Sequence, residues 1–279
     1  MKVDPSQRSR PIGVFDSGLG GLTVAAELAE LLPGEDIVYL GDSARVPYGI
    51  KSLETVRRFA REDAKFLLGM DPKLLVVACN TASAAAIDTL RDLSGVSVVD
   101  VIAPGSAEAI TCGEGPVGVV ATEATIRSGA YQATLESLAP GREVHLAACP
   151  LLVPIVEEGR AEDDPIVTHV LCDYLRDMLR VRPTSLILGC THYPLLSRAI
   201  GKLMGPDTTL ISSGAAAARD VARVLEACDA KNPQDAPGQL DCYTTDNPER
   251  FAKLGERFGR RKLTSVHYVG TDELELNFS

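Results

Sequence analysis

LLVVACNTAS at residues 74–83 and SLILGCTHYP at residues 185–194 share one local pattern, an apolar run followed at once by cysteine and polar residues. Short apolar runs bounded by polar residues are typical of strands buried in a parallel sheet. The polar residues after each cysteine can begin a helix, so each stretch predicts a strand-to-helix junction. Cys79 and Cys190 would then stand at the carboxyl ends of two strands, the edge where open parallel sheets bind ligands.

Similar spacing elsewhere indicates an internal repeat. Cys190 follows Cys79 by 111 positions, and GVVAT from Gly118 follows GVFDS from Gly13 by 105 positions. Because the two offsets nearly agree, we expect two related α/β halves. Two halves that face each other would place the two thiols across one cleft.

Apolar runs alternate with helical stretches along the rest of the chain, as in βα units with a mainly parallel sheet. The predicted fold class is α/β, with two similar three-layer domains related by a pseudo-twofold axis and an active site in the interdomain cleft. We expect the main strands at residues 12–15, 37–40, 74–78, 117–121, 144–148 and 185–189. Further strands are expected near the start of 211–227 and in the tail, at 243–246 and 265–270.

The tail strands affect the predicted domain boundaries, because we expect them to return to the first sheet. The first domain would consist of residues 1–102 together with 212–279, and the second of residues 103–211. Ser52 is expected to cap the helix that follows it, and one helix is expected around residues 163–180.

The composition narrows the class of protein. Hydrophobic residues make up 45% and charged residues 24% of the 279 residues, which excludes disordered and fibrous chains. The net charge is −10 without a block of Lys or Arg, which argues against nucleic-acid or anionic-lipid partners. MKVDPSQRSRPIGVF has no apolar signal-peptide core, and no run approaches the roughly 18 apolar residues of a membrane span. We therefore expect a cytoplasmic protein.

The seven cysteines lack the regular spacing of a disulfide scaffold. Most are expected to be ordinary thiols, namely Cys112, Cys149, Cys172, Cys228 and Cys242.

Cys79 and Cys190 are different, because the residues after each can bind a carboxylate at a helix N-terminus. These residues are Asn80-Thr81 and Thr191-His192. The helix dipole is also expected to lower a cysteine pKa from about 8.5 toward neutrality. A thiolate on one side and a thiol on the other suit removal of a proton from one face of a carbon and its return to the opposite face, which is racemisation or epimerisation.

Other kinds of site have little support in the sequence. The glycine-rich turn at residues 18–21 lacks the last glycine of a dinucleotide-binding motif, and no Gly-Lys-Ser or Gly-Lys-Thr phosphate loop is present. The four histidines are scattered and no Cys-x-x-Cys occurs, so neither a metal nor a thioredoxin-type site is expected. A pyridoxal-dependent reaction stays open on composition alone, although no residue requires it.

Five segments resemble the signature segments of the glutamate racemase family and occur in the same order. They are DSGLGGL at 16–22, PYG at 47–49, ACNTA at 78–82, CPLLVPIVEEG at 149–159 and GCTHYP at 189–194. The resemblance implies a cofactor-independent interconversion of L- and D-glutamate by two cysteines between two similar α/β domains, supplying D-glutamate for bacterial peptidoglycan. It also implies a homodimer and no metal.

The resemblance assigns roles to individual residues. Cys79 and Cys190 match the family's two catalytic cysteines, each the base for one enantiomer and the acid for the other. Asp16 matches the acidic residue that assists the first cysteine or holds the substrate ammonium group. His192 matches the histidine that assists the second cysteine.

Glu157 matches a further acidic helper, with its neighbour Glu158 as the alternative. The resemblance places the positions that line the substrate at Asp16, Ser17, Tyr48, Gly49, Asn80, Thr81, Thr125, Thr191 and His192.

Two other functions stand as alternative hypotheses. One is a related racemase acting on aspartate, although His192 after Cys190-Thr191 resembles the glutamate enzymes, whereas aspartate racemases tend to carry Glu there. The other is a binding or regulatory protein that retains the cleft without catalysis. Comparing kcat/KM for glutamate and aspartate tests the first, and glutamate binding without proton exchange would favour the second.

Overall fold

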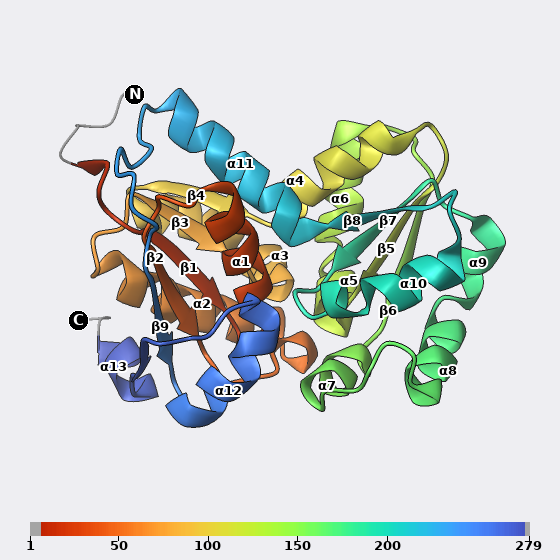
Figure 1. Ribbon diagram of the computed structural model, residues 1–279. Coiled ribbons are helices and arrows are strands. Elements are labelled where there is room, and N and C mark those ends of the chain that lie inside the picture. The colour runs from red at the N-terminus through yellow and green to blue at the C-terminus, as the bar shows by residue number, and fades with distance from the viewer. Residues whose placement is uncertain (1–6, 277–279) are drawn as a thin grey trace.

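The fold is built on two separate parallel sheets. The computed structural model describes residues 7–276 and is drawn in Figure 1. The first sheet contains β1 (Ile12–Asp16), β2 (Ile37–Gly41), β3 (Leu74–Val77), β4 (Ser97–Asp100), β9 (Leu240–Thr244) and β10 (Val266–Tyr268). The second contains β5 (Val117–Ala121), β6 (Val144–Ala148), β7 (Ser185–Gly189) and β8 (Thr209–Ser212). Every neighbouring pair in both sheets is parallel, which confirms the α/β class.

The strand order confirms the predicted repeat. The first sheet has the order β10-β9-β2-β1-β3-β4 and the second β6-β5-β7-β8, so β1 to β4 correspond to β5 to β8. Gly13 pairs with Leu75, and Gly118 pairs with Leu186. Each cysteine follows its paired leucine by four residues. The cysteines therefore occupy equivalent places, and the connections between the strands absorb the difference between the two offsets.

Helices cover both faces of the first sheet because alternate strand residues point to opposite sides. Leu74 and Val76 belong to the core beneath α1 (Leu22–Leu31), α11 (Ser213–Ala227) and α12 (Pro248–Gly259). Leu75 and Val77 pack on the other side, which is covered by α2 (Leu53–Leu68), α3 (Asn80–Ser94) and α13 (Thr271–Leu276).

The second sheet is also the middle of three layers. One face is covered by α4 (Ile102–Ala109) and α6 (Ala130–Leu138), and the other by α7 (Leu152–Glu157), α8 (Pro165–Tyr174), α9 (Arg176–Val181) and α10 (Ser197–Met204). Helix α5 (Glu123–Ser128) lies beside α3 and the 3-10 turn η2 (Tyr48–Ile50). Two further 3-10 turns are η3 (Ile110–Cys112) and η4 (Tyr193–Leu196).

The tail returns to the first sheet, as expected. Strand β9 pairs with β2 (Figure 1), and β10 pairs with β9. On this arrangement we propose the domain division given above, with connections near residues 102 and 211. Residues 1–6 and 277–279 of the first domain lie outside the described part of the chain.

Several local expectations change in the structure, and one is confirmed. Ser52 caps α2, since its side chain accepts a hydrogen bond from the Thr55 amide at 3.2 Å. Strand β4 was not predicted. The helix expected around residues 163–180 is two helices, α8 and α9, which meet at Leu175. Cys190 is followed by the 3-10 turn η4 instead of an α-helix, with Pro194 at its start.

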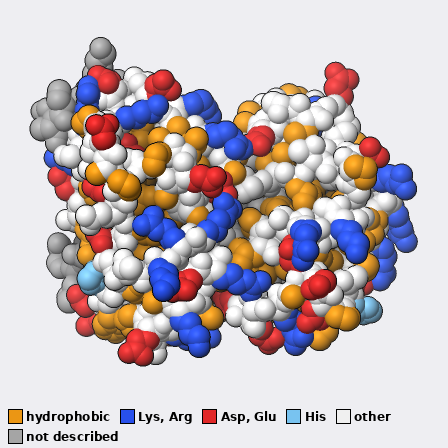
Figure 2. All heavy atoms as spheres, in the orientation of Figure 1, with side chains coloured by type: hydrophobic (Ala, Val, Ile, Leu, Met, Phe, Trp, Pro, Cys, Tyr) orange, Lys and Arg blue, Asp and Glu red, His pale blue; other side chains and the backbone are white. Residues whose placement is uncertain are grey.

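No described helix combines the length and the apolar character that crossing a membrane requires. Figure 2 shows two lobes that meet along a groove, with basic and acidic side chains interspersed on this face.

Candidate active site

A cleft of about 220 Å³ brings together residues from both sheets. Cys79 follows β3 of the first sheet and Cys190 follows β7 of the second, and both line this cleft. The other lining residues are Ser17, Val46, Pro47, Tyr48, Gly49, Ile50, Asn80, Thr81, Thr122, Pro150, Val153, Pro154, Glu157, Thr191 and His192. The structure therefore gathers every predicted site residue at the cleft wall except Asp16 and Thr125.

Cys79 is the N-cap residue of α3 and is nearly enclosed by its neighbours. Its Sγ atom accepts a hydrogen bond from the Ala82 amide at 3.4 Å and donates to Ser17 Oγ at 3.8 Å. Burial, followed by the negative charge of Asp16, raises the pKa of the Cys79 thiol to about 12. The expectation of a lowered pKa is therefore wrong for Cys79, because burial outweighs the hydrogen bonds at the helix N-terminus.

Cys190 belongs to a chain of three polar groups. Its Sγ atom lies 3.9 Å from His192 Nδ1, and His192 Nε2 lies 3.0 Å from Glu157 Oε1. Burial lowers the pKa of His192, but the hydrogen bonds with Cys190 and Glu157 outweigh it and raise this pKa to about 10. The hydrogen bond to His192 lowers the pKa of Glu157. An imidazolium group thus lies between a sulfur and a carboxylate.

The structure distinguishes Glu157 from its neighbour. Glu158 forms an ion pair with Arg160 at 3.2 Å, and its side chain is 64% exposed. Glu157 is the acidic residue that faces His192.

Asp16 lies behind the cleft wall. Its side chain accepts hydrogen bonds from the Gly18 amide at 3.0 Å and from Thr191 Oγ1 at 3.4 Å. Burial raises the pKa of Asp16, while the positive charge of His192 opposes that rise. Asp16 can therefore hold Thr191 in place and influence Cys79 and His192 through its charge, without lining the cleft.

The glycine-rich turn is needed for close contact between the two units. A Cβ atom on Gly20 would lie 2.1 Å from Thr191 Oγ1 and 2.5 Å from His192 Nδ1. Any larger residue would displace the segment that carries His192. Thr23, just after the turn, also reaches across, since its hydroxyl donates to the Thr191 carbonyl at 3.0 Å.

Three threonine hydroxyls form a ring where the two units meet. Thr81 Oγ1 lies 3.0 Å from Thr122 Oγ1 and 3.1 Å from Thr125 Oγ1, and the last two are 2.9 Å apart. Thr81 and Thr122 line the cleft, whereas Thr125 is enclosed behind them. Thr125 can thus orient the other two hydroxyls.

The side-chain carbonyl of Asn80 is a hydrogen-bond acceptor without a donor among the described residues, 7–276. Its Nδ2 atom donates to Tyr131 Oη at 2.9 Å, and Tyr131 Oη lies 3.2 Å from Ser213 Oγ. The buried Asn80 Oδ1 atom has no hydrogen-bond partner among these described residues. Buried polar atoms are usually paired, so this carbonyl can accept a hydrogen bond from a ligand.

The repeat could have identified one lining residue that the sequence analysis missed. Thr122 stands four positions after Gly118, just as Ser17 stands four positions after Gly13. The remaining missed residues line the cleft with apolar surface and lie within or next to the quoted segments; they are Val46, Pro47, Ile50, Pro150, Val153 and Pro154. Apolar lining residues lack the chemical signature that identifies a thiol or an imidazole.

The described residues include no group of three or more His, Cys, Asp or Glu side chains placed to hold a metal ion.

Comparison with known proteins identifies the family. The Asp/Glu/Hydantoin racemase family model matches residues 12–221. The chain belongs to this family. As a member of this racemase family, the protein is an isomerase.

Individual relatives in the family are similar over nearly their whole length. A glutamate racemase from Thermus thermophilus is 48% identical over 267 residues, which cover 95% of this chain and 98% of that protein. The structure of glutamate racemase from Francisella tularensis in complex with D-glutamate has a TM-score of 0.89 at 39% identity, covering 95% of this chain and 99% of that one. Glutamate racemase from T. thermophilus in complex with β-chloro-D-alanine has a TM-score of 0.85 at 45% identity, covering 96% and 99%.

Proposed function

We propose that the protein interconverts L-glutamate and D-glutamate without a cofactor, by proton transfer between the α-carbon and two cysteines, Cys79 and Cys190. The observation that carries this proposal is that these thiols, from equivalent strands of two sheets, line one cleft. The relatives that cover almost the whole chain are glutamate racemases, and one of them is described in complex with D-glutamate.

The reaction needs one base and one acid on opposite faces of the substrate. The thiolate of one cysteine takes the α-proton, so that an S–H bond forms and the electrons of the C–H bond remain on the α-carbon. The thiol of the other cysteine then gives its proton to the opposite face and becomes the thiolate. Nothing is oxidised or reduced, and the roles of the two cysteines reverse for the other enantiomer.

The polar groups around each cysteine fit these roles. His192, held by Glu157, places a positive charge 3.9 Å from Cys190 Sγ, the atom that exchanges a proton with the substrate. Ser17 accepts a hydrogen bond from the Cys79 thiol, and a bound ammonium group would offset the nearby charge of Asp16.

The polar groups of the cleft also fit an amino acid with two carboxylates. The hydroxyls of Ser17 and Thr81 can donate to carboxylate oxygens, and Asn80 Oδ1 can accept from the ammonium group. Asp16 accepts the hydrogen of the Thr191 hydroxyl and so holds Thr191 at the cleft wall. Tyr48 and Gly49 shape the wall, while Asp16 and Thr125 support it from behind.

The family resemblance extends the proposal to the cell. We propose that the protein acts in the cytoplasm as a homodimer and that its D-glutamate enters peptidoglycan. Light scattering of the purified protein tests the dimer.

Incubation of metal-free, cofactor-free protein with L-glutamate in D2O tests the reaction. Circular dichroism follows the loss of optical activity, and NMR follows deuterium at the α-carbon. We expect both changes with the wild type. Cys79→Ser and Cys190→Ser should each abolish steady racemisation, because each variant lacks the acid or the base on one face of the substrate. Cys172→Ser, at an exposed thiol on α8, is the matched control and should behave as the wild type.

Parallel reactions with L-aspartate separate the alternatives. If only aspartate were racemised, the substrate would be aspartate and not glutamate. Glutamate binding without exchange in folded, reduced protein would mean that the cleft is a binding site and would overturn the proposal.

A further inference from the structure

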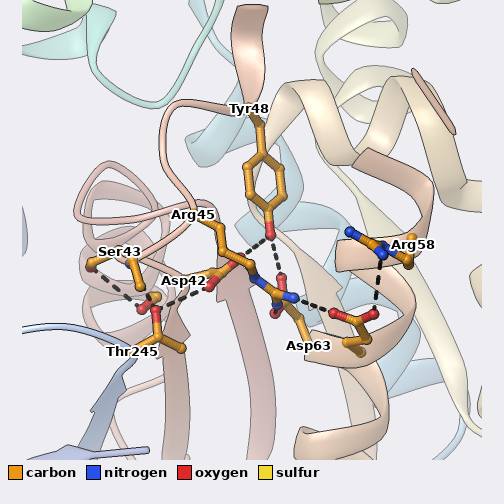
Figure 3. A network of polar contacts seen from close by, with 10 residues as sticks. Asp42, Ser43, Arg45, Tyr48, Arg58, Asp63 and Thr245 are labelled. Carbon is orange, nitrogen blue, oxygen red and sulfur yellow. Dashed lines mark hydrogen bonds and ion pairs between the residues drawn. The ribbon is translucent and has the colours of Figure 1, made fainter. Parts of the chain in front are cut away.

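Tyr48 lines the cleft, and its hydroxyl reaches into a buried polar network of carboxyl groups (Figure 3). Tyr48 Oη lies 2.9 Å from Asp63 Oδ2 of α2 and also contacts Asp42 Oδ2, just after β2. Arg45 joins the same network, donating from Nε to Asp42 Oδ2 at 2.7 Å and from Nη2 to Asp63 Oδ1 at 3.0 Å. Tyr48 thus touches two carboxyl groups with one hydroxyl.

The number of protons limits how these contacts can form. A phenol carries one proton, so Tyr48 can donate to only one of the two carboxyl groups. Both oxygens of Asp42 receive hydrogen bonds from other groups, Oδ2 from Arg45 and Oδ1 from the Thr245 hydroxyl at 3.0 Å, whereas Asp63 receives one from Arg45 at Oδ1 alone. Asp42 is therefore the carboxylate that accepts from Tyr48, and Asp63 Oδ2 is free to carry a hydrogen. Thr245 donates there with its hydroxyl hydrogen, and the same oxygen accepts from the Ala44 amide at 2.9 Å. The contact between Tyr48 and Asp63 then requires a hydrogen on Asp63.

The charge balance leads to the same assignment. Three carboxyl groups, those of Asp42, Glu62 and Asp63, surround the guanidinium of Arg45, and their side chains are 0%, 4% and 0% exposed. Arg58 approaches the same cluster at Glu62, at 3.9 Å, and its side chain is 62% exposed. Burial, then the charge of Asp42, raise the pKa of Asp63 well above its usual range. Three buried anions around one buried cation would be costly, and one proton reduces that cost.

We propose that Asp63 is a neutral carboxylic acid at neutral pH that donates its proton to Tyr48 Oη and so positions the cleft wall. The chain of hydrogen bonds runs from Asp63 through Tyr48 to an ionised Asp42. Asp63 is a positioning residue, since it lies behind the wall and does not line the cleft. Its effect on turnover rests on the proposed racemase function, but its protonation does not.

The segment that Tyr48 anchors, residues 48–51, contacts the second unit. Tyr48 is followed by Gly49, on which a Cβ atom would lie 2.7 Å from Thr122 Cβ of the second unit. Arg127 of the second unit also donates to the Lys51 carbonyl at 3.2 Å. If Asp63 ionised, it could no longer donate to Tyr48 and would repel Asp42, so the wall would lose its support.

Urea unfolding of the wild type, Asp63→Asn, Asp63→Ala and Asp42→Asn between about pH 5 and pH 7 tests the protonation without any substrate. An amide can donate to Tyr48 and accept from Arg45, as a neutral acid does, so we expect Asp63→Asn to keep the wild-type unfolding midpoint or exceed it. Asp63→Ala loses both bonds and should unfold at lower urea. Asp42→Asn replaces an acceptor oxygen by a donor and should also unfold at lower urea.

The pH dependence has a definite sign. An unfolded Asp has a pKa of about 3.9, so above that pH the folded wild type retains a proton that the unfolded chain has lost. The wild type should therefore lose stability relative to Asp63→Asn as the pH rises, until Asp63 ionises in the folded state. The ratio of their unfolding constants should change by up to about tenfold per pH unit. A ratio that does not change, or an Asp63→Asn variant as unstable as Asp63→Ala, would overturn the proposal. The proposal would also be overturned if Asp42→Asn kept the wild-type unfolding midpoint while Asp63→Asn unfolded at lower urea.

Carboxyl ¹³C NMR of aspartate-labelled wild type reads the proton directly, with Asp63→Asn used to assign the signal. A protonated shift at pH 7 is expected, and an ionised shift would refute the proposal. In the glutamate assay, Asp63→Asn should keep a near wild-type KM and Asp63→Ala should raise it. A protonated Asp63 without any glutamate turnover would leave this inference standing and refute the proposed function instead.

Discussion

Replacing Glu157 by Gln tests the polar chain that ends at Cys190. Glu157 Oε1 lies 3.0 Å from His192 Nε2, and its side chain is 32% exposed, whereas that of His192 is 6% exposed. The amide can still accept a hydrogen bond but carries no negative charge. The substitution therefore removes the charge that stabilises the imidazolium and leaves the packing nearly unchanged.

The size of the effect follows from this geometry. A hydrogen bond between charged groups contributes about 1.5–3 kcal/mol. Solvent reaches Glu157, so the lower end of that range, about 1.5 kcal/mol, applies. Since one pKa unit corresponds to about 1.4 kcal/mol, the pKa of His192 should fall by about one unit from its wild-type value of about 10.

Two measurements follow this change. Proton-detected ¹⁵N NMR titration reads the imidazole nitrogens, and because the chain has only four histidines the His192 signal can be assigned with one variant. Initial rates in both directions read catalysis, and a loss of about tenfold in kcat/KM is expected if the charge also acts in the transition state. The loss must be equal in the two directions, because the enantiomers have equal free energies in water.

Glu158→Gln is the matched control. This substitution also removes one carboxylate charge, but from the next residue, whose side chain pairs with Arg160 and not with His192. The reasoning is refuted if Glu157→Gln leaves the pKa of His192 unchanged, or if Glu158→Gln lowers it by as much.

Three further substitutions or conditions probe other parts of the molecule. Gly49→Ala would place a Cβ atom 2.7 Å from Thr122 Cβ, so we expect a loss of about 1–3 kcal/mol in stability, measured by urea unfolding, and a raised KM. With its pKa at about 12, Cys79 in the substrate-free protein should react with iodoacetamide about tenfold faster per pH unit up to that value, measured by mass spectrometry of the modified peptide. Lys73→Ala leaves the carboxylate of Glu35 buried without its ion-pair partner, so we expect a loss of about 3–5 kcal/mol in unfolding free energy.

Each of these has a contrary result. An unchanged unfolding midpoint for Gly49→Ala would mean that the two units separate at little cost. A Cys79 alkylation rate that levels off below pH 9 would mean that the thiol is more acidic than its burial implies. A Lys73→Ala variant as stable as the wild type would show that solvent reaches Glu35.

The sequence identified the two cysteines because their local pattern occurs twice. An apolar run followed by cysteine predicts a strand with the cysteine at its end, and this prediction depends on local residues alone. The return of the tail to the first sheet was also predictable, because YTTD and SVHYVG have strand patterns and no second core of their own. Strand β4 was missed because only two of its four residues, Val98 and Val99, are apolar, whereas all four residues of β3 are.

The network behind Tyr48 could not be assembled from sequence, because its members come from separate segments that only the fold brings together. One signal was nevertheless present. Asp63 lies four positions after Phe59 and four before Leu67, on the buried face of α2. A carboxylate at such a position requires a partner or a proton, although the sequence does not say which. The pKa of Cys79 was mispredicted for a related reason, because burial depends on neighbours that are remote in sequence.

The ring of Thr81, Thr122 and Thr125 gives the cleft a property that fixed donors lack. Each hydroxyl both donates and accepts, so the three O–H bonds can circulate in either sense around the ring. Reversing the sense rotates hydrogens only and moves no heavy atom. A hydroxyl of this ring that turns its hydrogen toward a ligand can still accept a hydrogen bond from a neighbouring threonine, so the cleft wall can offer either a lone pair or a hydrogen at that position while the scaffold stays in place.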